Sequence, residues 1–438
     1  MSDTIFALSS GRPPAGIAVI RISGPAAFST VERFTGRPAP FAARRAVLCP
    51  LMEPESGERL DRALILCFPG PHSVTGEDLV EWHCHGGQAV VRALLDALAR
   101  EAASGQGALR PAEAGEFTRR AFENGRIDLN EAEGLADLLA AETETQRRTA
   151  LRMAEGHFSR LLGEWRTGLL RCSAWTESLL DFSDEDDIAD TAVERHLRET
   201  LADLAQAMRA QLAAPSAERL RDGVRLVLAG PPNAGKSTLL NALAGREAAI
   251  VSDIAGTTRD RIEVPVSIDG IAFVLTDTAG LAENSTDAIE RIGIDRAGQA
   301  IREADLLLWL GDPADCPRAD AIKLAPQMDR AERCAAPVAG ADLAISAKSG
   351  FNMDALHRLL VDRARAFLPA EDGFALHRRQ RDAVASMAEE LDGAVSQPDL
   401  LLVAENLRRA RAAMDRLVGR SGVEDMLDAL FGQFCVGK

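Results

Sequence analysis

Residues 230–237 read Gly230-Pro231-Pro232-Asn233-Ala234-Gly235-Lys236-Ser237. This spacing is that of the phosphate-binding loop G-x-x-x-x-G-K-[ST]. The apolar run 224–229 before the loop predicts a buried strand, and residues 238–243 predict a helix, so both neighbours that the motif needs are present. Backbone N–H groups of such a loop and the N-terminus of the next helix bind anionic oxygens. The alternative, a glycine-rich turn without a ligand, leaves Lys236 and Ser237 unexplained.

We therefore expect this loop to hold the phosphates of a nucleoside triphosphate. Lys236 is placed to reach the β- and γ-phosphates, and Ser237 to offer its hydroxyl oxygen to Mg²⁺. The predicted phosphate-binding residues are Asn233, Ala234, Gly235, Lys236, Ser237 and Thr238.

Length and composition bound the rest of the chain. A chain of 438 residues is too long for one hydrophobic core, so we expect two to four domains. No apolar stretch approaches the roughly 20 residues of a membrane span. The N-terminus lacks the features of a signal peptide, and the seven cysteines show neither zinc spacing nor a disulfide framework. A reducing cytoplasm is the expected location.

Net charge weighs against broad electrostatic capture of nucleic acid. The chain carries a formal charge of −16, has no tyrosine, and contains only 4% aromatic residues. An aromatic stacking platform for single-stranded RNA is therefore not expected. RNA stays open as a target where a partner supplies the basic surface.

The chain divides by pattern into four segments. Residues 1–117 mix short strands such as 17–22 and 63–68 with a helix near 90–99, as an α+β domain does. Residues 118–215 and 371–438 show helical spacing of apolar residues. Residues 216–370 alternate strands and helices like a doubly wound α/β domain. This order predicts an α/β domain inserted into a helical one, whose two parts pack as a single bundle.

Three further segments narrow the nucleotide to GTP. Asp277-Thr278-Ala279-Gly280 follows an apolar strand, where Asp277 can hold Mg²⁺ through water and Gly280 N–H can sense the γ-phosphate. Thr258 lies between the two motifs and is a candidate Mg²⁺ ligand on a loop ordered by the γ-phosphate. Ser346-Ala347-Lys348 resembles the loop that packs on a guanine base. Each segment is weak alone, but their order and separation make a strong signal.

Two positions depart from the usual GTPase pattern. Pro326-Gln327-Met328-Asp329 stands for the guanine-reading box Asn-Lys-x-Asp. Asp329 can still accept two hydrogen bonds from guanine, so a preference for guanine is expected, weakened by the missing Asn and Lys. Leu281 stands where Ras-like enzymes have the glutamine that orients the attacking water. Either the protein hydrolyses GTP poorly, or another group orients the water; an inactive GTPase that serves as a scaffold also stays open.

Segments along the chain, most of them outside the GTPase boxes, carry a family resemblance. The most specific are the Gly-Thr-Thr-Arg-Asp loop at 256–260 and the ending Phe434-Cys435-Val436-Gly437-Lys438, and further segments are 3–7, 16–24, 76–81, 85–87 and 115–122. Together they closely resemble the bacterial tRNA modification GTPase family MnmE, also called TrmE, along essentially the whole chain. The resemblance implies a folate-binding-like N-terminal domain that forms a homodimer, a helical domain, and an inserted GTPase domain.

The resemblance also implies a reaction. Members of the family act with a flavoprotein, MnmG, to add an aminomethyl or carboxymethylaminomethyl group to C5 of the wobble uridine of certain tRNAs. A tetrahydrofolate derivative, 5-formyl- or 5,10-methylene-tetrahydrofolate, is implied as a further cofactor. The sequence does not identify the folate, the tRNAs or the amine donor.

Site residues follow from the family's motifs. K⁺ takes the place of an arginine finger, held by Asn233 with oxygens of Ser252, Ile254 and Thr257. Glu290 is implied to orient the attacking water. Cys435 is either a reactive thiol or a small core residue: its residue type favours packing, and its place in the terminal motif favours a function. The folate site would comprise Arg21, Glu81, Arg126 and Lys438; a surface ion pair is the simpler account of Arg21 or Glu81 alone. The expected nucleotide-site residues beyond the phosphate loop are Ser252, Asp253, Ile254, Ala255, Gly256, Thr257, Thr258, Asp277, Thr278, Ala279, Gly280, Asp329, Ser346, Ala347 and Lys348.

Three other functions stay open at this point. A ribosome-assembly GTPase shares the boxes but normally appends a basic RNA-binding domain, whereas this chain appends an acidic helical one. A nucleotide-sensing scaffold for the flavoprotein would need no hydrolysis. The N-terminal domain could itself perform folate-dependent transfer. His83 and His85 would share one face of a strand, but two ligands without partners do not predict a transition metal.

Overall fold

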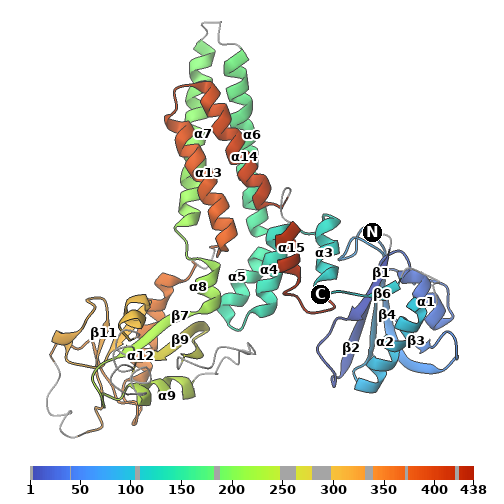
Figure 1. Cartoon of the computed structure of the whole chain (residues 1–438), viewed down its shortest axis with the longest axis horizontal. Helices are drawn as coiled ribbons and strands as arrows, with labels where there is room; N and C mark the ends of the chain where they lie inside the picture. Colours follow the sequence, from blue (N-terminus) through green and yellow to red (C-terminus); the bar gives the residue numbers. More distant parts are fainter. Residues whose placement is uncertain are drawn as a thin grey trace, which may run out of the picture. The chain divides into compact units, whose positions relative to one another are not determined.

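The structure is a computed structural model of the chain, and it describes residues 3–39, 41–103, 109–181, 188–246, 263–278, 297–330, 339–369, 373–419 and 424–438. The chain forms two compact units. The first comprises Met1–Ala136 with Asp415–Lys438, and the second comprises Asp137–Met414. Each unit is described separately below (Figure 1).

A six-stranded sheet with the order β3-β4-β5-β2-β1-β6 forms the centre of the first unit. Neighbouring strands are antiparallel except β1 and β6, which are parallel. Strand β4 begins four residues before the predicted strand 63–68, because its polar start still pairs with β3. The strands are β1 (Thr4–Leu8), β2 (Ile17–Ser23), β3 (Val47–Met52), β4 (Arg59–Phe68), β5 (Leu79–His85) and β6 (Leu109–Pro111).

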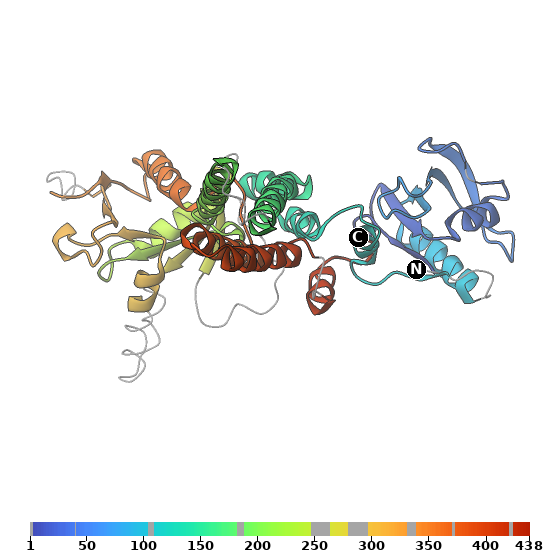
Figure 2. The same cartoon turned by 90° about the horizontal axis from the view of Figure 1, so that it is seen from above.

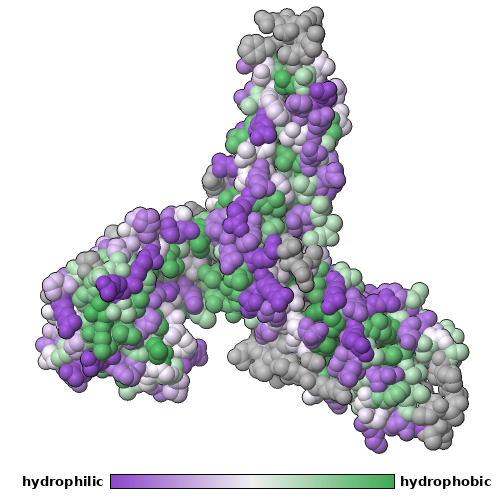
Figure 3. Space-filling view, turned by 180° about the vertical axis from the view of Figure 1, so that it is seen from behind, coloured by the Kyte–Doolittle hydropathy of each residue, from purple (hydrophilic) through white to green (hydrophobic). Residues whose placement is uncertain are grey.

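Two helices, α1 (Ala27–Thr35) and α2 (Gln88–Ala103), cover one face of this sheet. Alternate strand residues such as Ile20, Ile65 and Trp82 point into the core between sheet and helices. Leu48 and Leu64 face each other across β3 and β4 on the opposite face, where they are 45% and 44% exposed. Figure 3 shows hydrophobic side chains on the surface of this lobe. One face of the sheet is therefore partly open.

The end of the chain packs within the first unit. Helix α15 (Glu424–Phe431) contacts α3 (Glu116–Glu123), and its Leu427 and Phe431 pack against the start of α4 (Leu129–Ala140). Val436 pairs with Ala114 in an antiparallel bridge. Residues more than 300 positions apart thus complete one core.

A helical bundle occupies one part of the second unit. Helix α6 (His157–Asp181) packs on α7 (Ile188–Leu212). Helix α13 (Arg378–Ser396), which follows the α/β part in the sequence, also packs on α7. Helices α5 (Glu144–Ala154) and α14 (Leu400–Leu417) complete this part. Figures 1 and 2 both show α13 and α14 beside α6 and α7. The two helical segments of the sequence meet here.

A second six-stranded sheet, with the order β12-β11-β10-β7-β9-β8, lies between them in sequence. All neighbouring pairs are parallel except β8 and β9. Leucines of α9 (Lys236–Arg246) and α12 (Met353–Ala364) pack on one face, and the helix at 297–303 packs on the other. The strands are β7 (Val224–Ala229), β8 (Glu263–Ile268), β9 (Ile271–Asp277), β10 (Leu306–Trp309), β11 (Ile322–Ala325) and β12 (Leu343–Ala344).

The chain enters and leaves this α/β part at one place. Ser216, just before helix α8 (Ala217–Asp222), forms a parallel bridge with Leu376. Arg381 donates to the carbonyl oxygens of Leu212 and Ala214 at 2.7 and 2.8 Å. The predicted fold class, an α+β domain with a helical bundle and an inserted α/β domain, is confirmed. The segment boundaries predicted at 117, 215 and 370 stay a prediction.

Two short 3₁₀ helices, η1 (Pro313–Asp315) and η2 (Arg365–Phe367), complete the described elements. Among the described residues, no helix combines the length and the hydrophobicity that crossing a membrane would need.

Candidate nucleotide and folate sites

The phosphate-binding loop joins β7 to α9. Its lysine is buried: Lys236 is 5% exposed, and its Nζ donates to the carbonyl oxygens of Gly230 and Pro231 at 2.9 and 3.0 Å. These bonds hold the ammonium group over the loop, where it can meet phosphate oxygens. The loop therefore has the strand, turn and helix that its sequence predicts.

Two oxygen groups converge beside the loop. Ser237 Oγ donates to Asp277 Oδ2 at 2.6 Å. Asp277 reaches this position because β9 runs parallel to β7, which puts it opposite Leu228 at the carboxyl end of the sheet. Thr278 fixes this end of the strand through Oγ1, which donates to the Leu228 carbonyl oxygen at 3.0 Å. A hydroxyl and a carboxylate are the hard oxygen ligands that Mg²⁺ takes, so these residues fit that ion.

The expected base-binding loops also meet. Asp329 follows β11 and Ser346 follows β12, and Ser346 Oγ donates to Asp329 Oδ1 at 2.8 Å. Met328 N–H donates to the Ile345 carbonyl oxygen at 3.1 Å. The Ser346 hydrogen bond, with the charge of Lys348 nearby, lowers the pKa of Asp329 below its ordinary value. The carboxylate is therefore oriented and kept ionised, as hydrogen bonding to guanine N–H groups requires.

Part of the expected nucleotide site lies outside the described residues. Asn233 is described: it is exposed and has a left-handed backbone with φ of 61°. Ala234, Gly235 and Thr238 are described within the loop and the first turn of α9, and Ala347 and Lys348 follow Ser346. The predicted residues that lie outside are Ser252, Asp253, Ile254, Ala255, Gly256, Thr257, Thr258, Ala279, Gly280, Leu281 and Glu290.

The expected folate residues lie in the first unit. Arg21 Nη2 and Glu81 Oε1 form an ion pair at 2.8 Å on neighbouring strands, and the Arg21 guanidinium lies 5.7 Å from the ring centre of Phe117. The Phe117 N–H donates to the Lys438 carbonyl oxygen at 3.2 Å. The structure thus brings Arg21, Glu81 and the Lys438 backbone to one region around Phe117.

Arg126 and Cys435 also lie in the first unit. Arg126 follows α3 and its Cγ lies close to Gly76, where an added Cβ would come within 3.3 Å. Cys435 is exposed, and its carbonyl oxygen accepts from Lys438 N–H at 3.2 Å. An exposed thiol next to the tail contact is accessible to a substrate, although no side chain in the described part of the chain is a bonding partner that marks it as activated.

The two histidines of β5 have separate partners. His83 Nε2 lies 3.3 Å from Glu81 Oε2, and His85 Nδ1 lies 2.7 Å from Asp61 Oδ1. Within the described ranges, no group of three or more His, Cys, Asp and Glu side chains could hold a metal ion.

Sequence reasoning missed two features of these sites. Arg120 is fully buried and binds carboxylates of Asp3, Glu77 and Glu116 behind the folate region. Gln327 donates to the Asn233 carbonyl oxygen at 3.0 Å. The i, i+4 spacing of Glu116 and Arg120 was readable as a helical ion pair, but nothing in the sequence marks the contact of Gln327 with a residue 94 positions away.

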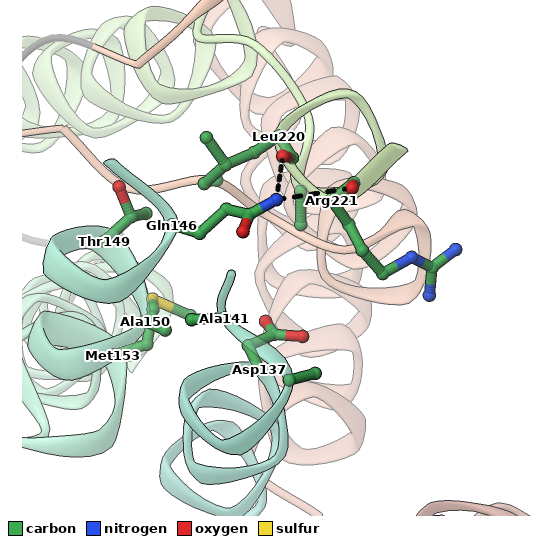
Figure 4. A pocket seen from close by; sticks show the side chains of 11 residues that line it. Asp137, Ala141, Gln146, Thr149, Ala150, Met153, Leu220 and Arg221 are labelled. Carbon is green, nitrogen blue, oxygen red and sulfur yellow. Dashed lines mark hydrogen bonds between the residues drawn. The ribbon is translucent and has the colours of Figure 1, made fainter. Parts of the chain in front are cut away.

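A small pocket lies elsewhere, where α4, α5 and α8 meet in the second unit (Figure 4). Gln146 reaches across it and donates to the carbonyl oxygens of Leu220 and Arg221 at 3.0 and 3.4 Å. Most of its lining is apolar, including Ala150, Met153 and Leu220, with Asp137 and Arg221 among the polar lining residues. The nucleotide loop remains the stronger candidate site.

The fold and the loop define a P-loop nucleotide-binding protein with a guanine-type base loop. Comparison with known proteins identifies its family. Residues 4–126 match the model for the GTP-binding protein TrmE N-terminus, and residues 129–435 match that for the MnmE helical domain. The chain belongs to the MnmE family of tRNA modification GTPases, and it is a GTPase.

Full-length relatives support this assignment. The chain is 59% identical to the tRNA modification GTPase MnmE of Rhizorhabdus wittichii, over 100% of this chain and 97% of the relative. It is 51% identical to that of Zymomonas mobilis, over 99% of this chain and 100% of the relative. The G domain of the T. maritima FeoB iron transporter is 23% identical over 32% of this chain and 98% of that domain, with a TM-score of 0.24. The full-length relatives identify the family, whereas the FeoB domain does not.

Proposed function

We propose that the protein is a K⁺-stimulated GTP hydrolase that acts with the flavoprotein MnmG. Its product would be an aminomethyl or carboxymethylaminomethyl group on C5 of the wobble uridine of certain tRNAs. The convergence of Lys236, Ser237 and Asp277 at the end of β7 supports the nucleotide chemistry. The relatives, which are named tRNA modification GTPases, support the tRNA substrate.

The described residues divide the work on the nucleotide. Lys236 offsets charge on the β- and γ-phosphates, and loop N–H groups bind their oxygens. Ser237 and Asp277 would hold Mg²⁺, which neutralises charge on the same phosphates. Asp329 accepts hydrogen bonds from the guanine base, and Ser346 keeps its carboxylate oriented. These contacts position GTP for attack by water.

K⁺ would supply the charge that an arginine finger supplies elsewhere. Asn233 is the one proposed ligand within the described residues, and its amide oxygen suits a weakly hydrated cation. Glu290 is proposed to orient the attacking water in place of the glutamine that Leu281 replaces. Both assignments rest on the family resemblance.

GTP turnover in matched KCl and NaCl tests the cation requirement. We expect the wild type to be several-fold faster in KCl, and Asn233→Ala to lose that difference. Asn241→Ala, an exposed position on α9, is the matched control and should keep it. Equal wild-type rates in the two salts would remove the K⁺ mechanism.

Folate binding is proposed for the region around Arg21, Glu81, Arg126 and Lys438. Guanidinium and ammonium groups there can meet folate carboxylates, and Glu81 can bond the pterin edge. Titration of 5-formyl- and 5,10-methylene-tetrahydrofolate by calorimetry tests this. Binding that is unchanged in Arg21→Ala and Glu81→Ala would leave their ion pair as a structural contact only.

A homodimer through the first unit is proposed from its open sheet face. Leu48, Leu64 and Ile17 are exposed there, and burial of such side chains favours association. Light scattering should give a dimer for the wild type and a larger monomer fraction for Leu64→Glu. A monomeric wild type would contradict the proposal.

The tRNA reaction is tested by mass spectrometry of tRNA from a strain that lacks the protein. Wobble uridines should lose the C5 group and regain it when the wild-type chain is supplied. Wobble uridines should also lack the C5 group in a strain without the flavoprotein, because the two proteins are proposed to act together. Wobble uridines that keep their C5 group in the strain without the protein would refute the proposed function.

Two alternatives are separated by further tests. Glu290→Ala should abolish both hydrolysis and modification; modification that persists without hydrolysis would favour a nucleotide-sensing scaffold. Co-sedimentation with ribosomal subunits would favour a ribosome-assembly GTPase, which the charge of −16 argues against.

A further inference from the structure

One contact joins the base-binding loop to the phosphate-binding loop. Gln327 Nε2 donates to the backbone carbonyl oxygen of Asn233 at 3.0 Å. The same amide lies over Gly235, where an added Cβ would stand 3.5 Å from Gln327 Nε2. Gln327 is two residues before Asp329, so this single side chain connects the two ends of the nucleotide site.

The contact fixes the peptide group between Asn233 and Ala234. Its carbonyl oxygen accepts from Gln327, and its N–H donates to the Pro231 carbonyl oxygen at 3.3 Å. Asn233 has a left-handed φ of 61°, a conformation that non-glycine residues adopt rarely and that neighbouring contacts must maintain. Gln327 itself has a φ of 63°, so both partners have unusual backbone conformations.

A peptide that is held at both ends limits where the Asn233 side chain points. The backbone conformation sets the direction of the Cα–Cβ bond. The left-handed φ of Asn233 points this bond in a different direction from the one it would have in a right-handed conformation. The orientation of the following N–H groups, which face the phosphates, depends on the same peptide. Both depend on a hydrogen-bond donor at position 327.

We propose that Gln327 is a positioning residue that couples the base-binding loop to the phosphate-binding loop through the Asn233 carbonyl oxygen. It sets the backbone on which Asn233 presents its amide and so affects both nucleotide affinity and the response to K⁺. The K⁺ part of this inference rests on the proposed function; the nucleotide-affinity part does not.

Variants at this position separate hydrogen bonding from space filling. Gln327→Met keeps length and volume without a charge but cannot donate. Gln327→Lys keeps a donor that can reach the same carbonyl oxygen. Gln299→Met is the matched control, because Gln299 is exposed and its amide donates to Glu303 one turn along its own helix at 2.7 Å.

The full-length chain is used for two measurements: GDP affinity with Mg²⁺ by fluorescence titration, and the K⁺ concentration that gives half-maximal GTP turnover. Loss of one hydrogen bond of this kind should weaken GDP binding about three- to tenfold in Gln327→Met. The half-activating K⁺ concentration should rise by a similar factor, with less change in turnover at saturating K⁺. Gln327→Lys and Gln299→Met should stay close to wild type in both measurements.

The outcomes are distinct. If Gln327→Met binds GDP and responds to K⁺ like wild type, the coupling is wrong. If Gln327→Lys is impaired as much as Gln327→Met, the amide's shape matters rather than its donor, and the inference is also overturned. If wild type shows no K⁺ stimulation, the proposed cation mechanism fails, while the GDP comparison still decides the role of Gln327.

Discussion

Arg120 has a guanidinium group with 0% exposure and three acidic neighbours. It bonds Asp3 Oδ1 and Glu116 Oε1 at 3.0 Å each, and Glu77 Oε2 at 3.1 Å. These residues come from the chain's start, from the loop before β5 and from α3. A single buried charge thus connects three segments around the proposed folate region.

Replacing this residue should leave Glu77 without this cation and should take one of two cations from Asp3 and Glu116, which Arg110 also pairs with. Arg120→Met is expected to destabilise the first unit by about 3–5 kcal/mol, because breaking a buried ion pair from one side costs that much. Arg119→Met is the matched control: Arg119 is 38% exposed and its surface pairs are worth about 1 kcal/mol or less. Hydrogen exchange of β2 and β5 amides measures the effect in this unit alone. Equal protection in the two variants would contradict it.

The same cluster predicts a dependence on pH. Burial raises the pKa of Glu116, but hydrogen bonds from Arg110, Glu113 N–H and Arg120 lower it more, to a value below its ordinary 4.5. The folded state then binds fewer protons than the unfolded state, so the stabilisation is complete above about pH 4.5 and is lost as pH falls through the lower folded value.

Thermal unfolding of wild type and Glu116→Gln tests this sign. The wild type should be more stable at about pH 7, and the gap should shrink below about pH 4.5 as Glu116 takes up its proton. A gap that stays constant with pH would show that Glu116 acts by shape rather than by charge.

At this scale, the sequence predicts the structure around Lys236 and Ser237, because the strand, loop and helix lie in one short motif. Asp277 ends an apolar strand that joins the same sheet, and the roles of these residues stay predictions. The Arg120 cluster was not predicted because its partners are scattered and its residue types are common at surfaces. Arg21 and Glu81 do bond each other, as a surface pair would, so their role in folate binding stays a prediction.

At the scale of elements, helix α5 begins with a capping box. Thr143 Oγ1 accepts from Gln146 N–H, and Gln146 Oε1 accepts from Thr143 N–H at 3.0 Å. Thr145 N–H donates to the Gly270 carbonyl oxygen at 3.4 Å, in the turn between β8 and β9. Together with the Gln146 bonds to α8, this start of α5 is where the helical part meets the α/β part.

Gln146→Ala should loosen this junction. It removes the Gln146 half of the capping box, in which Oε1 accepts from Thr143 N–H, and the donor to the Leu220 and Arg221 carbonyl oxygens, an expected cost of about 1–3 kcal/mol. Amides of α5 and α8 should exchange faster, whereas Arg148→Ala, an exposed position on the same helix, should leave α8 unchanged. Unchanged α8 exchange in Gln146→Ala would show that the contact does not stabilise the junction.

Strand and helix types followed from periodicity, but their lengths did not. The predicted strand 63–68 is the buried half of β4, whereas Arg59 and Asp61 extend it as polar residues that pair with β3. The predicted helix near 90–99 is the middle of α2. Hydrogen bonds to neighbouring strands and turns extend elements past their apolar cores, and one sequence does not reveal those neighbours.

At the scale of the whole molecule, the chain turns back on itself twice. Helices α13 and α14 return to the bundle after the α/β part, and Asp415–Lys438 returns to the first unit. The insertion was predictable because helical segments flank the α/β pattern. The docking of the last five residues was not, because a short tail carries no periodicity.

The tail fits only with glycine at its penultimate position. Gly437 has a φ of 100°, and an added Cβ would lie 2.1 Å from the Leu8 carbonyl oxygen. Gly437→Ala should therefore release the tail, and the Phe117 amide, which donates to Lys438, should exchange faster. Val436→Ala is the control, since that side chain is 57% exposed. An unchanged exchange rate of the Phe117 amide in Gly437→Ala would contradict the release of the tail.

The contacts between distant parts of the chain affect folding during translation. Arg119 and Asp428 form an ion pair between residues 309 positions apart, and Phe431 completes a core begun by Leu129. The N-terminal domain of this chain thus lacks packing residues until the segment around Phe431 has been made. Its maturation would finish late, which makes the newly made N-terminal region a natural client for chaperones while the intervening helices and GTPase core are still being translated.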